Sequence, residues 1–300
     1  MSDPQVLLAA QADTAESPLW DAKRGGLWWL DIPRGEVHFL DPSTGRDRRR
    51  LVGQPVGCMA LTRQGDLLLA VRDGLRVTNG DLVETPVLWP LPDEPDGNRP
   101  NDGRVDSRGR FWIGTMAMDK HAAAGSLYRA DLDAKPPEIV RILDKVSISN
   151  GIDWSPDDTQ MYYADSPTRR VDVFDWDPVA GMVSRRRPFV TLSPAEGVPD
   201  GLCVDADGHV WVALWGGGAV RRYRPDGVLD REVGLPVRYV TSCAFGGEEL
   251  DELFITTATS DLNPSQLASE PMAGAIFRYQ PRCQGRQPNL AAIQGGDQDR

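Results

Sequence analysis

Three oxygen-bearing side chains, Glu16, Asn150 and Asp200, stand at the corresponding position of a unit that recurs along the chain. Two carboxylates and one amide carbonyl form a hard, all-oxygen donor set of the kind that binds calcium, magnesium or manganese, and that can also accept zinc. Three protein ligands leave coordination positions open, so such a centre can polarise a carbonyl group and lower the pKa of a bound water. We predict one divalent-cation site, with calcium favoured and zinc, manganese or magnesium as alternatives.

Each of these side chains also has a plain structural explanation. Asn-Gly and Asp-Gly pairs, here Asn150-Gly151 and Asp200-Gly201, commonly form turns, and Glu16 could be a solvated loop residue. The shared register of all three residues favours a metal site over three unrelated turns.

Further polar side chains occur at the third start of the same unit, in the segment 99–102. Arg99 and Asn101 carry directional hydrogen-bonding groups, which the hydroxyl groups and ring oxygen of a sugar require. Arg99 could equally pair with a carboxylate such as Asp119. The segment 116–124 is long for a hairpin connection, so it could fold over the site as a lid.

The recurring unit begins with a small or polar residue and glycine, continues as a short apolar segment, turns at Asp/Gly, and resumes as an apolar strand rich in aromatic residues. Alternating apolar residues between Asp-Gly and Pro turns are typical of β-strands, and we find no helical pattern of ten residues or more. The spacing of 41 to 50 residues is that of a propeller blade. The six starts are Glu16, Gly57, Asn101, Asn150, Asp200 and Ser242.

This repeat predicts an all-β fold, a six-bladed β-propeller with four-stranded blades that forms one domain over residues 1–300. A single sheet cannot bury both of its faces, whereas six sheets stacked in a closed ring can. Equivalent positions of the first strands then converge on a central channel, and the segment 6–10 supplies the last strand of the unit that begins at Ser242. We expect the Gln-, Gly- and Asn-rich tail after about residue 281 to be poorly ordered. The alternative is a β-sandwich with accidental periodicity.

Composition excludes several classes of partner. The 300 residues carry a formal net charge of −11, which disfavours nucleic acid and anionic membranes and suits a neutral substrate. No apolar stretch reaches the length of a membrane span, and no secretory signal pattern follows Met1, so we expect a cytoplasmic protein. The four cysteines lie far apart in sequence, which indicates buried free thiols rather than disulfides or a zinc site.

The motifs, taken in order over residues 5 to 280, resemble those of the senescence marker protein/gluconolactonase family, which includes regucalcin and bacterial sugar lactonases. The resemblance implies a six-bladed propeller with one divalent cation held by Glu16, Asn150 and Asp200. It also implies that Asp200 acts as the general base and that Arg99, Asn101 and Asp119 contact the substrate. The motifs are Glu16-Ser17-Pro18-x-Trp20, 99–103, 114–116, 149–151, 199–201 and 213–217.

We therefore predict an enzyme, a divalent-metal-dependent carboxylic ester hydrolase that opens a small, neutral sugar (aldono-) lactone to the aldonic acid, as a monomer or weak homo-oligomer. Two departures from the family pattern bear on the choice of sugar: Ala15 replaces a glycine and Met118 an acidic loop residue. The alternatives are a non-enzymatic calcium-binding regulatory propeller, an esterase or phosphotriesterase on the same fold, and a protein-interaction propeller.

Overall fold

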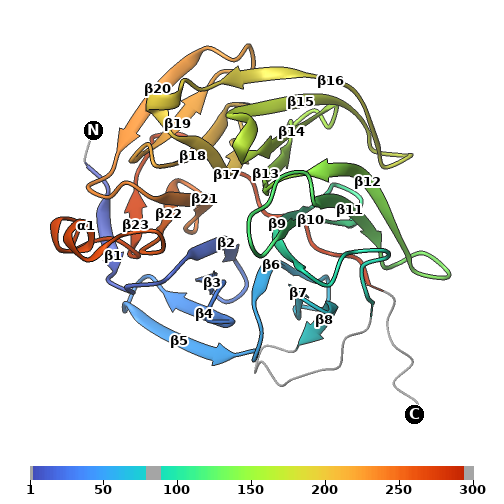
Figure 1. Ribbon diagram of the computed structural model, residues 1–300, viewed down its shortest axis with the longest axis horizontal. Helices are drawn as coiled ribbons and strands as arrows, with labels where there is room; N and C mark the ends of the chain where they lie inside the picture. Colours follow the sequence, from blue (N-terminus) through green and yellow to red (C-terminus); the bar gives the residue numbers. More distant parts are fainter. Residues whose placement is uncertain (1–2, 79–88, 294–300) are drawn as a thin grey trace.

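The computed structural model describes residues 3–78 and 89–293, which form six antiparallel β-sheets arranged in a ring around a central channel (Figure 1). This confirms the predicted six-bladed propeller. Five sheets have four strands. Blade two has three strands among the described residues, and Leu75 pairs with Trp89 at its outer edge.

The strands follow the same order in each blade, from the channel outward. The inner strands are β2 (Ala15–Asp21), β6 (Val56–Leu61), β9 (Asn98–Val105), β13 (Ser149–Trp154), β17 (Val198–Val204) and β21 (Val240–Gly246). The second strands are β3 (Gly26–Asp31), β7 (Leu67–Val71), β10 (Phe111–Ala117), β14 (Gln160–Asp165), β18 (Val210–Trp215) and β22 (Glu252–Thr257).

The third strands are β4 (Glu36–Asp41), β8 (Gly74–Thr78), β11 (Gly125–Asp131), β15 (Arg170–Asp177), β19 (Ala219–Tyr223) and β23 (Ile276–Tyr279). The outer strands are β5 (Arg46–Leu51), β12 (Glu138–Val146), β16 (Met182–Thr191), β20 (Leu229–Gly234) and β1 (Gln5–Leu8). The described residues also form three short helices, η1 (Ser166–Thr168), η2 (Pro194–Glu196) and α1 (Pro264–Ser269). Within the described ranges, no helix has the length and apolar character needed to cross a membrane.

The ring closes through strands from both ends of the chain. Strand β1 pairs antiparallel with β23, with Val6 opposite Phe277, so the first strand of the chain completes blade six. This confirms the predicted closure, with the strand at Gln5–Leu8 rather than at 6–10. Because strands from the start and the end of the chain share one sheet, blade six ties the two ends together and closes the ring.

Large side chains pack between neighbouring blades and fix their relative positions. Trp112 of blade three lies with its ring centre 5.8 Å from that of Trp154 and 5.5 Å from that of Trp176, both in blade four. All three indoles are buried. Burying an aromatic side chain contributes about 2–3 kcal/mol relative to exposure, so this contact helps to hold blades three and four together.

The segment 281–293, which we call the C-terminal strap, differs from the expectation that the tail after about residue 281 is poorly ordered, and residues 294–300 lie outside the described residues. The strap crosses the end of the channel opposite the predicted cation site and appears in Figure 1 as the thin red segment behind the inner strands. Arg286 Nη2 donates to Asp153 at 3.2 Å, and Asn289 Nδ2 donates to the carbonyl oxygen of Val105 at 3.0 Å. The expectation failed because the strap is held by backbone and polar contacts, which leave no periodic pattern in the sequence.

Candidate functional site

The six inner strands share one irregularity at the position where the repeat begins. In every blade the pairing of the inner strand with the second strand shifts there, as between Glu16 and Leu19 in β2 or Ser149 and Ile152 in β13. A bulge changes the direction in which side chains point and is frequent next to functional sites. The repeat therefore aims the side chains at its start toward the common channel.

Glu16, Asn150 and Asp200 are all buried near this end of β2, β13 and β17, with exposed fractions of 4%, 5% and 6%. Burial raises the pKa of both carboxyl groups well above their usual values, and the charge of Asp200 raises the pKa of Glu16 further. The two carboxylates thus lie within electrostatic reach of each other, although 184 residues separate them in sequence.

The amide of Asn150 lies in a chain of hydrogen bonds. Its Oδ1 accepts from Asn101 Nδ2 at 2.9 Å, and its Nδ2 donates to Ser166 Oγ at 2.7 Å. Asn101 Nδ2 also donates to the carbonyl oxygen of Ser149 at 2.8 Å. A carbonyl oxygen has two lone pairs, so Asn150 Oδ1 can accept from Asn101 and still face a cation.

Arg99 is bonded to the same chain through one nitrogen. Its Nη1 donates to Asn101 Oδ1 at 2.8 Å and to the carbonyl oxygen of Pro100 at 2.9 Å. Burial lowers the pKa of Arg99 to about 10, although the charge of Glu16 acts in the opposite direction. Both amide hydrogens of Asn101 are used within the protein, whereas Arg99 Nε and Nη2 donate to none of the described residues, so Arg99 is better placed than Asn101 to donate to a substrate.

Asp102 is a residue of this site that the sequence analysis did not single out. Its charge raises the pKa of both Glu16 and Asp200, and burial raises its own pKa to about 6, while Arg104 opposes that rise. Three acidic groups therefore share the channel. The signal was present in Asn101-Asp102-Gly103, but the pattern alone did not show that Asp102 also reaches the channel.

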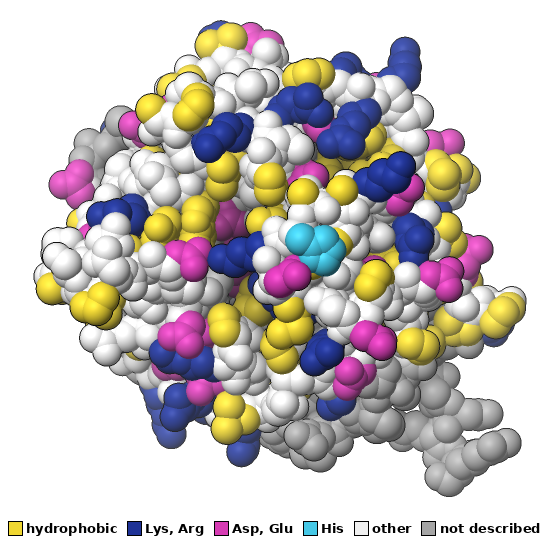
Figure 2. All heavy atoms as spheres, viewed as in Figure 1, with side chains coloured by type: hydrophobic (Ala, Val, Ile, Leu, Met, Phe, Trp, Pro, Cys, Tyr) yellow, Lys and Arg dark blue, Asp and Glu magenta, His cyan; other side chains and the backbone are white. Residues whose placement is uncertain are grey.

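The segment 118–124, which we call the mouth loop, connects β10 to β11. Its ends are fixed to the start of β9, where Asn98 Nδ2 donates to the carbonyl oxygen of Ala124 at 2.7 Å. Lys120 in this loop forms an ion pair of 2.9 Å with Asp261, which follows β22 in blade six on the opposite side of the ring. The loop thus crosses the mouth of the channel. Figure 2 shows this face, with basic and acidic side chains gathered near its centre.

Asp119, the predicted substrate contact on this loop, does not touch the buried carboxylates in the described part of the chain. Its side chain is 73% exposed and pairs with Nδ1 of His121, and hydrogen bonds from His121 lower its pKa. Its contact with a substrate stays a prediction that needs movement of the loop.

Comparison with known proteins decides the family. Residues 14–259 match the model of the SMP-30/gluconolactonase/LRE-like region, which is most of the chain. The chain belongs to the SMP-30/gluconolactonase/LRE-like family. Among its relatives are YvrE of Bacillus subtilis, whose name describes it as a sugar lactone lactonase, and human regucalcin. YvrE is 36% identical over 93% of this chain and 96% of its own length, and regucalcin 35% identical over 91% and 93%.

A solved structure extends the comparison to three dimensions. The crystal structure of a calcium-binding protein, regucalcin, from Agrobacterium tumefaciens superimposes with a TM-score of 0.92 at 29% identity, covering 97% of this chain and 98% of the other. This member of the SMP-30/gluconolactonase/LRE-like family therefore shares its whole architecture with a regucalcin.

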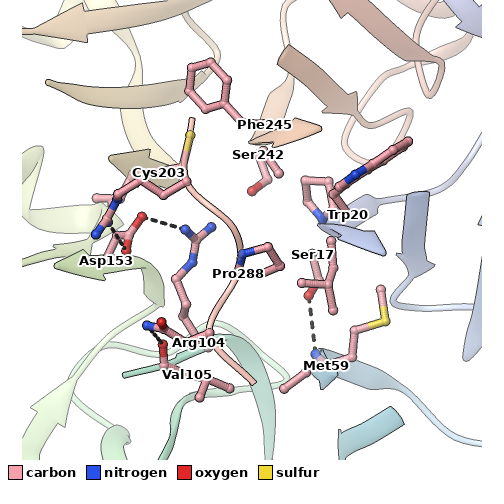
Figure 3. Close-up of a pocket in the computed structure, with 18 of the residues that line it drawn as sticks. Ser17, Trp20, Met59, Arg104, Val105, Asp153, Cys203, Ser242, Phe245 and Pro288 are labelled. Atoms are coloured by element: carbon pink, nitrogen blue, oxygen red, sulfur yellow. Dashed lines mark hydrogen bonds and ion pairs between the residues drawn. The ribbon is translucent and has the colours of Figure 1, made fainter. Parts of the chain in front are cut away.

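Below the buried carboxylates, the channel of this family member widens into a cavity of about 90 Å³ (Figure 3). Arg104 points into it and donates to Asp153 at 2.6 Å, and Pro288 of the C-terminal strap lies at its floor. The volume holds only a few water molecules. The strap therefore lines the end of the channel opposite the mouth.

A second cluster of potential metal ligands, Asp205, Asp207 and His209, is a structural turn. One oxygen of Asp205 accepts from the backbone N–H groups of Asp207 and His209, and the other accepts from Trp211 Nε1 and Arg222. Asp106 of blade three accepts in the same way from Trp112 and Arg110. We assign the Asp205 cluster to holding the hairpin.

Proposed function

We propose that this protein hydrolyses a small, neutral sugar lactone with the aid of one divalent cation held by Glu16, Asn150 and Asp200. Membership of a family whose name includes gluconolactonase, and the similarity to YvrE, whose name describes it as a sugar lactone lactonase, support the reaction class. The observation that carries the proposal is the burial of two mutually repelling carboxylates and of the Asn150 amide at the same end of the inner strands.

The donor set fits a hard cation. Glu16 and Asp200 have raised pKa values because each is buried and because acidic neighbours surround them, with Arg99 as the cation that acts on Glu16. Buried negative charge of this kind needs a compensating positive charge. A divalent ion would supply it, and carboxylate and amide oxygens suit calcium first, then manganese or magnesium, with zinc a further candidate.

The cation and Asp200 have different roles in the proposed hydrolysis. A bound divalent cation would supply Lewis-acid polarisation of the lactone carbonyl and lower the pKa of a water at the site. The Asp200 carboxylate accepts the proton of the attacking water. Water adds at the carbonyl carbon, the ring C–O bond breaks, and the ring oxygen takes up a proton, which gives the aldonic acid.

Two further features suit a sugar lactone. Arg99 Nε and Nη2 can donate to sugar hydroxyls, and the mouth loop limits exchange with bulk water during the reaction. The net charge of −11 does not repel a neutral lactone and opposes retention of the anionic product.

A panel of aldonolactones tests the proposal. The protein is stripped with a chelator, calcium, manganese, magnesium or zinc is added back, and acid release is followed with a pH indicator. We expect turnover only with a divalent ion. Asp200→Asn, which keeps the size of the side chain, should lower kcat by 10²- to 10⁴-fold, the usual contribution of a general base. Turnover at the wild-type rate in the stripped protein or in folded Asp200→Asn would contradict the proposal.

The second candidate function is a calcium-binding propeller without catalysis. It is favoured by one observation, the description of the Agrobacterium tumefaciens relative as a calcium-binding protein. Calcium binding at the site without turnover of any lactone in the panel would select it.

A further inference from the structure

The two ends of the Asn150 amide are chemically different, and only one of them can ligate a cation. Oδ1 carries lone pairs, whereas Nδ2 carries two hydrogens and would repel a positive ion. The usefulness of Asn150 to the site therefore depends on which end faces the channel. Nothing in the side chain's shape decides this, because the two ends have nearly the same size.

Ser166, the first residue of η1, decides which end of the Asn150 amide faces the channel. Its hydroxyl donates to the carbonyl oxygen of Pro199 at 2.6 Å, which uses its single hydrogen. Toward Asn150, Ser166 Oγ can then only accept, so the amide must present Nδ2 to it, at 2.7 Å. Asn101 reinforces the choice from the other side, because its Nδ2 needs an acceptor and finds Asn150 Oδ1.

The hydrogen bond between Ser166 and Asn150 is buried, so breaking it is costly. Ser166 is 4% exposed and Asn150 is 5% exposed, so neither can exchange its partner for bulk water. A reversed amide would leave Nδ2 facing Asn101 Nδ2 and Oδ1 facing a hydroxyl without a free hydrogen, and unsatisfied buried groups are costly. Pro199 directly precedes Asp200, so one hydroxyl ties the strand that carries Asn150 to the strand that carries Asp200.

We propose that Ser166 is a positioning residue that holds the carbonyl oxygen of Asn150 toward the cation. The inference rests on the proposed function, since it assumes a cation at Glu16, Asn150 and Asp200. Hydrogen-bond partners of metal ligands typically change metal affinity by 10- to 100-fold when they are removed. Ser166 itself contacts neither metal nor substrate.

The test measures calcium affinity by isothermal titration calorimetry on the full chain, with the melting temperature of each chelator-treated variant as the check on folding. We expect Ser166→Ala to weaken calcium binding by 10- to 100-fold. The matched control is Thr257→Val, which removes another buried hydroxyl that donates to a backbone carbonyl oxygen, that of Ala275 in blade six, and should leave calcium affinity unchanged.

A second background separates amide orientation from general loosening. In Asn150→Asp both terminal atoms are oxygens, so orientation no longer matters. Ser166→Ala should then change calcium affinity by less than threefold in that background. An undiminished loss there, or unchanged affinity of Ser166→Ala in the wild-type background, would overturn the assignment.

If Ser166→Ala does not fold, a crystal structure of the calcium-loaded wild type decides the matter. Coordination through Asn150 Oδ1 with Nδ2 on Ser166 supports the inference, and an Asn150 amide that does not bond Ser166 refutes it. Failure of the proposed function looks different, because wild-type protein would then bind no divalent ion or Asp200→Ala would bind it normally.

Discussion

Lys120 and Asp261 form an ion pair of 2.9 Å between blades that face each other across the ring. The two side chains are 57% and 49% exposed, so the pair is a surface contact. Exposed pairs contribute about 0–1 kcal/mol, which is enough to bias the mouth loop toward closure and too little to lock it.

Breaking this pair should change access to the site more than the chemical step. We expect Lys120→Glu to alter KM for a lactone by up to about fivefold with little change in kcat, because about 1 kcal/mol is at stake. The double exchange Lys120→Asp with Asp261→Lys forms the ion pair again with its charges reversed, so KM should return most of the way to the wild-type value. Lys23→Glu, in the turn after β2 away from the mouth, is the charge-matched control. A kcat loss as large as that of Asp200→Asn would show that Lys120 acts on the reaction itself.

Salt provides an independent check on the same contact. Ion pairs at the surface are screened over about 8 Å at physiological ionic strength and more strongly at 1 M. The KM of the wild type should therefore approach that of Lys120→Glu as the salt concentration rises. If KM changed in parallel with salt concentration in the two proteins, the ion pair between Lys120 and Asp261 would not control access to the site.

Asp102 should strengthen cation binding without being a ligand. Its charge acts on both Glu16 and Asp200, and it would act with opposite sign on a divalent ion. Replacing it with the isosteric asparagine should weaken calcium binding about fivefold, or about 1 kcal/mol, the scale of a charge interaction that is partly screened. Calorimetry on Asp102→Asn, with exposed Asp251→Asn as control, measures this. Tighter calcium binding in Asp102→Asn would be incompatible with the argument.

The sequence predicted the architecture well because the repeat records it directly. Each start of the unit falls on an inner strand, and the bulge at that position brings Glu16 and Asp200 together. Residues outside the period could not be found in this way. Ser166 lies in a short helix after a second strand, and Lys120 meets a residue of the opposite blade, so neither contact has a counterpart elsewhere in the repeat.

The C-terminal strap was mispredicted for a related physical reason. Its composition is that of a solvated tail, yet its contacts are made by backbone groups and by single polar side chains such as Arg286 and Asn289. A glycine is needed where the strap passes blade six, because a Cβ at Gly285 would lie 2.1 Å from Cβ of Phe245. Single residues of this kind specify a path without creating a periodic signal.

Removing the strap should open the lower end of the channel. Arg286→Ala loses bonds to Asp153 and to the carbonyl oxygen of Trp154, and we expect a cost of roughly 1–3 kcal/mol in the free energy of unfolding. A chain ending at Gln280 should be less stable still. Urea denaturation measures both, with exposed Arg108→Ala as a comparison. Stability equal to wild type in the shortened chain would mean that the strap does not hold the ring.

Cys203 reports on the same opening. It lines the cavity above the strap, and burial raises the pKa of its thiol, so it should react slowly with a thiol reagent in the intact protein. In the shortened chain, we expect its modification rate to rise by an order of magnitude or more under native conditions. Mass spectrometry identifies the modified cysteine. Equal rates in the two proteins would show that the strap does not close the channel.

The lowered pKa of Glu196 makes the free energy of unfolding depend on pH in the acid range. Hydrogen bonds from the side chain and backbone of Ser193, and then from Arg221, lower the pKa of Glu196 to about 2 from an ordinary value of 4.5. A lowered pKa in the folded state means that the unfolded chain binds the proton more readily. The contribution of Glu196 is therefore complete above pH 4.5 and is lost as the pH falls toward 2. Glu196→Gln should show a smaller drop in unfolding free energy between pH 4.5 and pH 2 than the wild type, measured by urea titration at each pH. Unfolding free energies that fall equally with pH in the two proteins would contradict this role of Glu196. Because η2 leads directly into the strand that carries Asp200, Glu196→Gln should also show faster amide exchange in residues 193–198 at neutral pH.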